Sequence, residues 1–405
     1  MSIYQLPKAF QIKICRDTIV SQIRKLLIND KLRFTGIDEE EIILWHVDIP
    51  TKDVDLGTTI KVEDIKGEIE MSLFADVENY FCNSEHYDEQ KPNRHINIIM
   101  QIITTEKILE FLQAKFKKLP GLPLITTYGC DFPFVGRMTT TRCLTESFIS
   151  QFKAACKGSD RNERPIFISD KYYLAGAPGT GKTRNLIETI LMIRSCFPDF
   201  ATNETQKQSH LLDDPVQILM TYNNNFLPLK IEKTLGADSA IGLRILHNYF
   251  ASKSYHYIFI DQMIDKFGVE PLKKLYVSMA IDIIAKSIRG DNVSCPLLIY
   301  IALDEFQKLV GAPFCNGDNE QERRQYLKEV TLALGYAMCH EFSINNIFII
   351  CHLAGTLLTP LSSVIASSSY QHIALPTPLL LPVDINFLFE QLQLTRSWWL
   401  NSLLL

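Results

Sequence analysis

Apolar positions near the start of the chain alternate with polar ones, as they do in strands that have one buried face. This alternation covers residues 10–14, 43–49 and 96–102, whereas residues 19–27 repeat apolar side chains at helical spacing. Short strands that flank one early helix are typical of a β-grasp sheet packed on that helix. We therefore expect a small β-grasp domain over residues 1–102, and its pattern contains no cluster that indicates catalysis.

A different pattern, in which strands alternate with helices, covers residues 126–390. It predicts an α/β fold with three layers, helix–sheet–helix, around a mostly parallel sheet. A helical linker at residues 103–125, which contains a Pro/Gly-rich break, precedes this domain, and a short apolar tail at residues 391–405 follows it. Strands are expected at residues 172–175, 216–222, 296–303, 346–351 and 373–375, and helices at 104–119, 144–152, 183–191, 237–250, 271–287, 326–338 and 386–394.

A glycine-rich segment stands between the strand predicted at residues 172–175 and the next helix. It fits the pattern G-x-x-x-x-G-K-[ST]. With Gly at ~7% of residues, the probability that a chain of this length matches the pattern by chance is about one in a hundred. In such a loop the backbone N–H groups converge on an anion, the lysine reaches the β- and γ-phosphates, and the hydroxyl binds Mg²⁺. The alternative is an ordinary turn between a strand and a helix. We expect ATP, or less readily GTP, to bind with Mg²⁺ at Gly176, Ala177, Pro178, Gly179, Thr180, Gly181, Lys182, Thr183 and Arg184, with Thr183 as a metal ligand.

An acidic pair, Asp304 and Glu305, ends the nearly continuous apolar run at residues 296–303, as in a Walker B element. In that arrangement Asp304 holds the Mg²⁺ that bridges the phosphates, and Glu305 is the general base that takes a proton from the attacking water. Asp261 is a rival because it also ends an apolar run, but Gln262 follows it where a base is required. A second alternative is that Asp304 and Glu305 only cap the start of a helix.

Further residues are candidates for contacts with a nucleotide. Residues 132–137, Phe-Pro-Phe-Val-Gly-Arg, are similar to the start of AAA-like and STAND-type NTPase modules, in which this segment lies beside the base. Arg137 is therefore a candidate for cofactor binding, and the alternative is a solvated turn residue. In such folds the strand beside Walker B often ends in a polar residue that senses the γ-phosphate. His352 and Thr356 are the candidates here, and either could simply end the strand.

Composition narrows the class of protein further. Hydrophobic residues make up 46% and charged residues 21% of the 405 positions, which indicates a globular protein. The formal charge of −5 gives no general attraction to nucleic acid or to an anionic membrane. We see no apolar run of the kind found in a conventional signal peptide or a transmembrane helix. The 10 cysteines include no C-x-x-C pair, so we expect reduced thiols and no zinc site.

Local sequences in the first domain carry a family resemblance. They are residues 34–38, Phe-Thr-Gly-Ile-Asp, residues 42–50, Ile-Ile-Leu-Trp-His-Val-Asp-Ile-Pro, and residues 95–99, His-Ile-Asn-Ile-Ile. This set resembles the N-terminal domain of the Crinkler effector family of oomycetes and fungi, whose leader module is similar to ubiquitin in fold. Residues 44–47, Leu-Trp-His-Val, fall where the oomycete members have Leu-Phe-Leu-Ala-Lys, and they are closer to the fungal form.

The resemblance implies a secreted protein that acts in the host cytoplasm or nucleus and contacts host proteins. Some larger Crinkler-type proteins carry a P-loop NTPase and then a nuclease after the leader. This chain leaves no room for a nuclease after residue 375, so we expect either a truncated gene model or a short natural form. The leading hypothesis is an effector that binds ATP with Mg²⁺ and hydrolyses it slowly. The alternative is a non-catalytic module that binds host proteins and carries a relic or switch-like NTPase domain.

Overall fold

The chain forms two compact units, Met1–Phe111 with Gln262–Lys274 and Leu112–Asp261 with Leu275–Leu405, and the described residues of each include one sheet. The structure is a computed structural model that describes residues 42–50, 69–70, 95–102, 105–116, 134–157, 164–170, 181–202, 209–223, 226–252, 254–311, 319–355, 371–376 and 381–391.

The first unit contains an antiparallel sheet with the strand order β2-β1-β3. Its strands are β1 (Ile42–Pro50), β2 (Ile69–Glu70) and β3 (His95–Ile102), and β1 pairs with β3 along most of its length. The strands predicted at residues 43–49 and 96–102 are thus confirmed. The strand predicted at residues 10–14 and the helix predicted at 19–27 lie outside the described residues, so the β-grasp fold stays a prediction.

The second unit is built on a five-stranded parallel sheet with the order β5-β6-β7-β4-β8. The chain leaves β4 for the far edge at β5, returns through β6 and β7 to the side of β4, and then crosses to β8. β4 and β7 are neighbours that the chain leaves in opposite directions, β4 towards β5 and β7 towards β8. Open α/β sheets bind ligands outside the carboxyl ends of strands at such a point. The strands are β4 (Ile166–Asp170), β5 (Val216–Thr221), β6 (Leu297–Asp304), β7 (Ile347–Ala354) and β8 (His372–Pro376).

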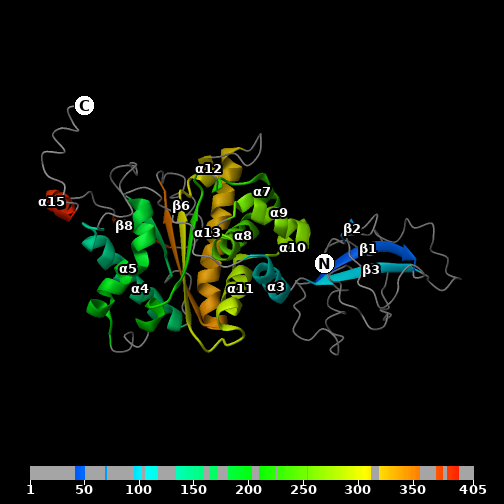
Figure 1. The fold of residues 1–405 in the computed structure, drawn as a ribbon, viewed down its shortest axis with the longest axis horizontal. Helices are drawn as coiled ribbons and strands as arrows, with labels where there is room; N and C mark the ends of the chain where they lie inside the picture. The colour runs from blue at the N-terminus through cyan, green and yellow to red at the C-terminus, as the bar shows by residue number, and fades with distance from the viewer. Residues whose placement is uncertain are drawn as a thin grey trace. The chain divides into compact units, whose positions relative to one another are not determined.

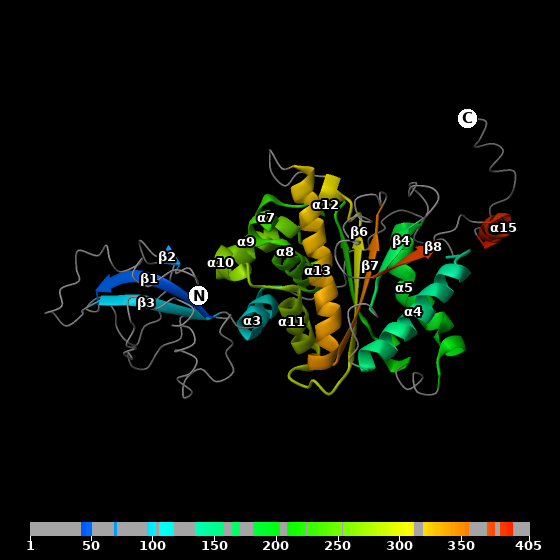
Figure 2. The same ribbon diagram turned by 180° about the vertical axis from the view of Figure 1, so that it is seen from behind.

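Helices cover both faces of this sheet (Figures 1 and 2). On one face, α4 (Met138–Cys156) and α5 (Lys182–Phe200) pack on each other, and α5 packs on β4, β6 and β7. On the other face, α8 (Ala237–Phe250), α11 (Val277–Arg289) and α13 (Glu320–Asn345) pack together, with α13 along β7 and α8 along β5. All residues of β6 and β7 are buried as a result. The predicted three-layer arrangement around a parallel sheet is confirmed.

One prediction and one alternative from the sequence are wrong for residues 256–289. The single helix predicted at residues 271–287 is two helices, α10 (Val269–Leu272) and α11, with an interruption between them. The apolar run before Asp261 is part of helix α9 (His256–Phe267), so Asp261 ends no strand and is not an alternative to Asp304. The strand predicted at residues 172–175 lies outside the described residues, and the pattern did not predict β4. The other described elements are α3 (Thr105–Lys115), η6 (Ser209–Leu212), α7 (Lys230–Leu235), α12 (Lys308–Gly311) and α15 (Pro382–Gln391).

Contacts from α8 determine where α11 begins. The backbone N–H of Val277 donates to Oδ1 of Asp238 at 2.7 Å, which satisfies a donor that the first turn of a helix leaves without an intrahelical partner. The carbonyl groups of Leu275 and Tyr276 lie against Gly242, where a Cβ atom would overlap them. A continuous helix through residues 273–276 would lose both contacts, because they need the extended backbone of Tyr276.

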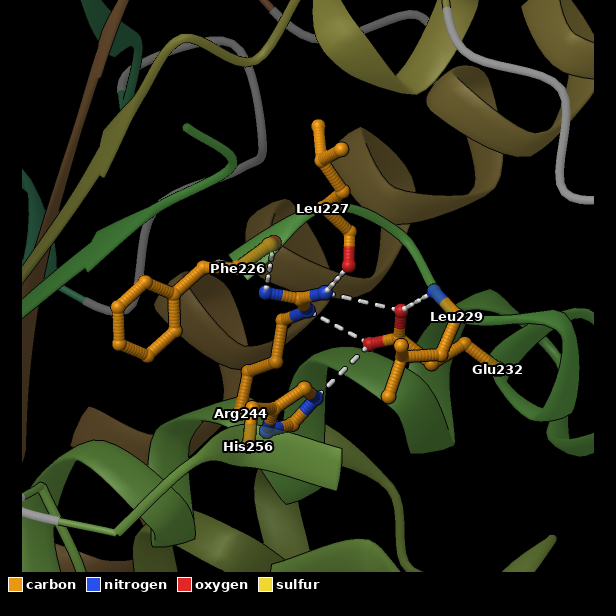
Figure 3. A network of polar contacts seen from close by, with 6 residues as sticks. All are labelled: Phe226, Leu227, Leu229, Glu232, Arg244 and His256. Atoms are coloured by element: carbon orange, nitrogen blue, oxygen red, sulfur yellow. Dashed lines mark hydrogen bonds and ion pairs between the residues drawn. The ribbon is translucent and has the colours of Figure 1, made fainter. Parts of the chain in front are cut away.

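A buried ion-pair network fixes the segment that follows β5 (Figure 3). Arg244 on α8 donates from Nε to Oε1 of Glu232 at 2.6 Å and from Nη2 to Oε2 at 2.9 Å. The same guanidinium donates to the carbonyl oxygens of Phe226 at 3.0 Å and Leu227 at 3.2 Å. Oε2 of Glu232 also accepts the backbone N–H of Leu229 at 2.7 Å. Most donors and acceptors of the pair are therefore used within the protein.

Neighbouring rings complete this network and bring it next to β6. Nε2 of His256 lies 3.1 Å from Oε1 of Glu232, and the Arg244 guanidinium lies 4.2 Å from the ring centre of Tyr222. Burial alone would raise the pKa of Glu232, but Arg244 and His256 outweigh it and lower this pKa to about 2. Burial and Arg244 also lower the pKa of His256. The backbone N–H of Tyr222 donates to the carbonyl of Asp304 at 3.1 Å, so the network adjoins the carboxyl end of β6.

We predict that Glu232→Ala lowers the free energy of unfolding by about 3–5 kcal/mol, because it leaves Arg244 buried without its carboxylate. Urea denaturation monitored by circular dichroism would measure the loss. Lys233→Ala is the control: it removes the ion pair between Lys233 on α7 and Glu322 on α13, whose side chains are 42% and 51% exposed. Its cost is expected at about 0–1 kcal/mol. Equal losses in the two variants would contradict a special role for the buried pair.

Candidate functional site

The helix that follows the glycine-rich segment begins as the motif requires. Gly181 is the N-cap of α5 and has φ = 81°, a left-handed backbone that side chains disfavour. A Cβ at this position would also lie 2.9 Å from Nη2 of Arg137. Both observations explain why a glycine stands before Lys182. Of the other predicted loop residues, Gly176, Ala177, Pro178, Gly179 and Thr180 lie outside the described residues.

The structure brings Thr183 and Asp304 together, although they are 121 positions apart in the sequence. Asp304 is the last residue of β6, and Thr183 lies in the first turn of α5. Oγ1 of Thr183 donates to Oδ2 of Asp304 at 3.1 Å. Lys182, which is 8% exposed, lies near enough to Asp304 to stabilise its negative charge. The two predicted metal ligands and the predicted phosphate-binding lysine therefore lie in one place.

The electrostatics of Asp304 are those of a buried acid. Burial raises the pKa of this carboxyl to about 6, and the charge of Glu305 adds to the rise. The hydrogen bond from Thr183 and the positive charge of Lys182 oppose it. Burial thus makes the charged form of Asp304 unfavourable in free energy. A cation bound beside the carboxylate would stabilise that form.

Glu305 lies directly after β6 in an unusual backbone conformation. Its φ of 56° is in the left-handed region, which is uncommon for a residue with a side chain. Its carboxylate accepts a hydrogen bond from Nε2 of Gln307. Because α12 begins only at Lys308, Asp304 does not cap a helix, and that alternative reading of the acidic pair is wrong.

Two arginines flank Phe134 at the start of α4 and α5. The guanidinium carbon of Arg137 lies 5.8 Å from the centre of the Phe134 ring, and that of Arg184 lies 5.7 Å from it. Arg184 also donates to Glu188 one turn along α5, at 2.7 Å. Arg137 is 9% exposed, so it is not a solvated turn residue. Its predicted role beside a nucleotide base stays a prediction.

His352 is placed differently from what the sequence predicts. It lies two residues before the end of β7 and is 0% exposed, so it does not fit a phosphate sensor at the end of the strand. Its Nε2 lies 2.8 Å from Oγ of Ser169 on β4, and its Nδ1 lies 2.9 Å from Oγ1 of Thr189 on α5. Nδ1 is also 3.3 Å from the hydroxyl of Tyr300 on β6. Thr356, the other candidate sensor, lies outside the described residues.

The hydrogen bonds around His352 determine its tautomer. The hydroxyl of Thr189 donates to the carbonyl of Asn185 at 2.7 Å, and that of Tyr300 donates to the carbonyl of Leu186 at 2.8 Å. Both hydroxyl protons are used, so Nδ1 of His352 carries the proton and Nε2 accepts from Ser169. Burial lowers the pKa of His352 to about 3, which keeps the ring neutral. Because Ser169 and His352 are fully buried, a substrate cannot reach this Ser–His pair. The contacts of His352 connect β4, α5, β6 and β7.

Sequence reasoning missed the residues that support the site. Ser169, Thr189 and Tyr300 lie on three different elements, and no spacing in the sequence relates them to His352. The sequence does place Gln307 near the acidic pair, two residues after Glu305. An isolated glutamine, however, does not by itself indicate a functional role. A polar residue within an otherwise apolar strand or helix face was the only available indication of the His352 cluster.

The fold and this group of residues define the second unit as an α/β protein with a polar site at the carboxyl ends of its parallel strands. Residues 2–101 match the family model described as the Crinkler effector protein N-terminal domain, which supports the Crinkler resemblance for that part of the chain. No match to a curated protein was found. Within the described parts of the chain, the helices are too short or too polar to cross a membrane.

We predict that His352 contributes to the pH dependence of stability. Its pKa is about 3 in the folded protein and about 6.5 in an unfolded chain, so the unfolded state binds more protons between these values. Stability is therefore complete above pH 6.5 and falls as the pH decreases, by up to about 1.4 kcal/mol per pH unit for this group. His352→Gln should reduce the loss between pH 6.5 and pH 5 by about 2 kcal/mol.

Urea midpoints measured across this pH range would test the prediction, because differences in slope do not depend on the absolute stability of the variant. His210→Gln is the control, since His210 is exposed to solvent in the folded protein as well as in the unfolded chain. A His352→Gln variant with the same slope as wild type would show that folding does not lower the pKa of His352.

Proposed function

We propose that this chain is a Crinkler-like effector whose second unit is a P-loop NTPase domain that binds ATP with Mg²⁺ and hydrolyses it slowly. The observation that carries the proposal is the hydrogen bond between Thr183 of the G-K-T sequence and Asp304 at the end of β6. Two motifs that were read separately from the sequence meet at the carboxyl edge of one parallel sheet. The effector part of the proposal rests on the match of residues 2–101.

The topology supports a phosphate site at this edge. β4 ends at Asp170, and α5 begins at Lys182, so the glycine-rich segment connects a parallel strand to a helix N-terminus. This is the context in which backbone N–H groups and the helix dipole bind phosphate. Lys182 would pair with the phosphate oxygens, and Gly181 allows the backbone to approach them.

The donor set at Thr183 and Asp304 fits Mg²⁺. A hydroxyl and a carboxylate are hard oxygen ligands, and their oxygens are already 3.1 Å apart. Both residues would hold the ion, which when bound supplies positive charge to the phosphate oxygens. Glu305 would accept a proton from the water that attacks the γ-phosphate. Secretion and delivery to the host cytoplasm or nucleus, and contacts with host proteins, are part of the same proposal and follow from the family resemblance.

We predict that Thr183→Val removes most of the Mg²⁺-dependent gain in ATP affinity, because valine keeps the shape of threonine without its hydroxyl. Thr183→Ser keeps the hydroxyl and should retain the gain.

We predict that Lys182→Ala weakens ATP binding about 10- to 100-fold, since hydrogen bonds to charged groups contribute about 1.5–3 kcal/mol. Titration calorimetry with ATP, in the presence of Mg²⁺ and in its absence with EDTA, measures each affinity.

Lys153→Ala is the matched control for Lys182→Ala, because Lys153 is an exposed lysine on α4. It should bind ATP as wild type does. The nucleotide-binding proposal is wrong if Lys182→Ala and wild type bind ATP with Mg²⁺ equally tightly, or if wild type does not bind it at all.

We predict that Glu305→Gln lowers the rate of ATP hydrolysis by about 10²–10⁴-fold, the range in which a general base contributes. The amide has nearly the shape of the carboxylate, so the affinity for ATP should change little. Steady-state release of phosphate, measured with protein saturated by ATP and Mg²⁺, provides the rate. Equal rates in the two proteins, with nucleotide bound to both, would favour the alternative function, a non-catalytic module whose NTPase domain is a relic or a switch.

A further inference from the structure

The turn after β6 is connected to the end of β7 at two points. The backbone N–H of Phe306 donates to the carbonyl of Ala354 at 3.4 Å, and the Phe306 side chain is 0% exposed. The side-chain amide of Gln307 packs against Gly355, where a Cβ atom would overlap its Oε1. Gln307 is 7% exposed, so its amide has little room to reorient.

The same amide contacts the carboxylate of Glu305. Nε2 of Gln307 donates to Oε2 of Glu305, which connects the two side chains across the turn. The backbone of Glu305 is left-handed at φ = 56°, and the N–H of Lys308 closes the turn by donating to the carbonyl of Glu305 at 2.9 Å. A residue in this conformation persists only where its surroundings hold it. Gln307 supplies part of that restraint, and it acts on the reactive group itself.

We propose that Gln307 is a positioning residue for Glu305: its buried amide, seated against Gly355, fixes the orientation of the Glu305 carboxylate for proton transfer from water. The inference rests on the proposed ATPase function and adds a residue that neither motif contains. A general base must be held within hydrogen-bond reach of the proton that it abstracts, and a displacement of about 1 Å can cost about 100-fold in rate. Without Gln307, the carboxylate would rotate among orientations of which few are productive.

The test is a double-mutant cycle with Gln307→Met and Glu305→Gln. Methionine matches glutamine in length but has no amide donor. We expect Gln307→Met alone to lower kcat for ATP hydrolysis about 10- to 100-fold, with the Kd for ATP and Mg²⁺ within about twofold of wild type. In the Glu305→Gln background the same substitution should change kcat by less than about twofold, because the base is already absent.

Gln325→Met is the matched control. It removes a bond of the same type, from Nε2 of Gln325 to Oε1 of Glu329 at 3.0 Å, on the exposed surface of α13. It should leave kcat unchanged. A second readout does not depend on turnover: the side-chain amide NMR signal that disappears in Gln307→Met should exchange slowly with solvent in nucleotide-free wild type and faster in Glu305→Ala.

The outcomes separate the two proposals. If wild type fails to bind ATP with Mg²⁺, the proposed function is wrong. If wild type binds but does not hydrolyse ATP, binding stands and the role of Gln307 is overturned. That role is also overturned if Gln307→Met has the wild-type kcat, if its effect is equally large in the Glu305→Gln background, or if it weakens ATP binding as much as it lowers kcat. The last two results would indicate a structural or a nucleotide-contacting residue.

Discussion

Complete burial of the central parallel strands is the constraint on which the second unit depends. Because helices cover both faces of β6 and β7, polar side chains are tolerated there only where partners satisfy them. His352 satisfies this condition through Ser169 and Thr189. Asp304, the last residue of β6, is also buried, and the hydroxyl of Thr183 donates to its carboxylate. The residues of the candidate site therefore gather at the carboxyl edge of the sheet.

Two buried polar clusters stabilise the elements that carry this edge. The His352 cluster joins the strand before the glycine-rich segment to the helix after it, and the Arg244–Glu232 pair holds the segment that follows β5. Both consist of groups that are costly to bury alone and acceptable when hydrogen-bonded. Such clusters specify one arrangement of the surrounding elements more strictly than apolar contacts do, since a shifted register would leave charges or donors without partners.

Local patterns predicted most of this α/β unit because its strands are short apolar runs and its helices repeat at 3.6 residues. The position of Asp304 after such a run sufficed to place it at a strand end. The break before Val277 could not be predicted, because it depends on Asp238 and Gly242 of another helix. The role of His352 was misjudged for a related reason: the end of β7 is determined by pairing with β4 and β6, and the sequence around His352 does not contain that information.

The contact at Gly242 has a consequence for how this sequence can change over time. Backbone carbonyls of Leu275 and Tyr276 occupy the space that any side chain at position 242 would need. Apolar residues elsewhere in the core can exchange with one another if their neighbours compensate in volume, but a main-chain atom cannot be replaced by a smaller one. Substitutions at position 242 are therefore not tolerated while α8 and α11 keep this packing. Another residue could be accommodated only if the two helices moved relative to each other.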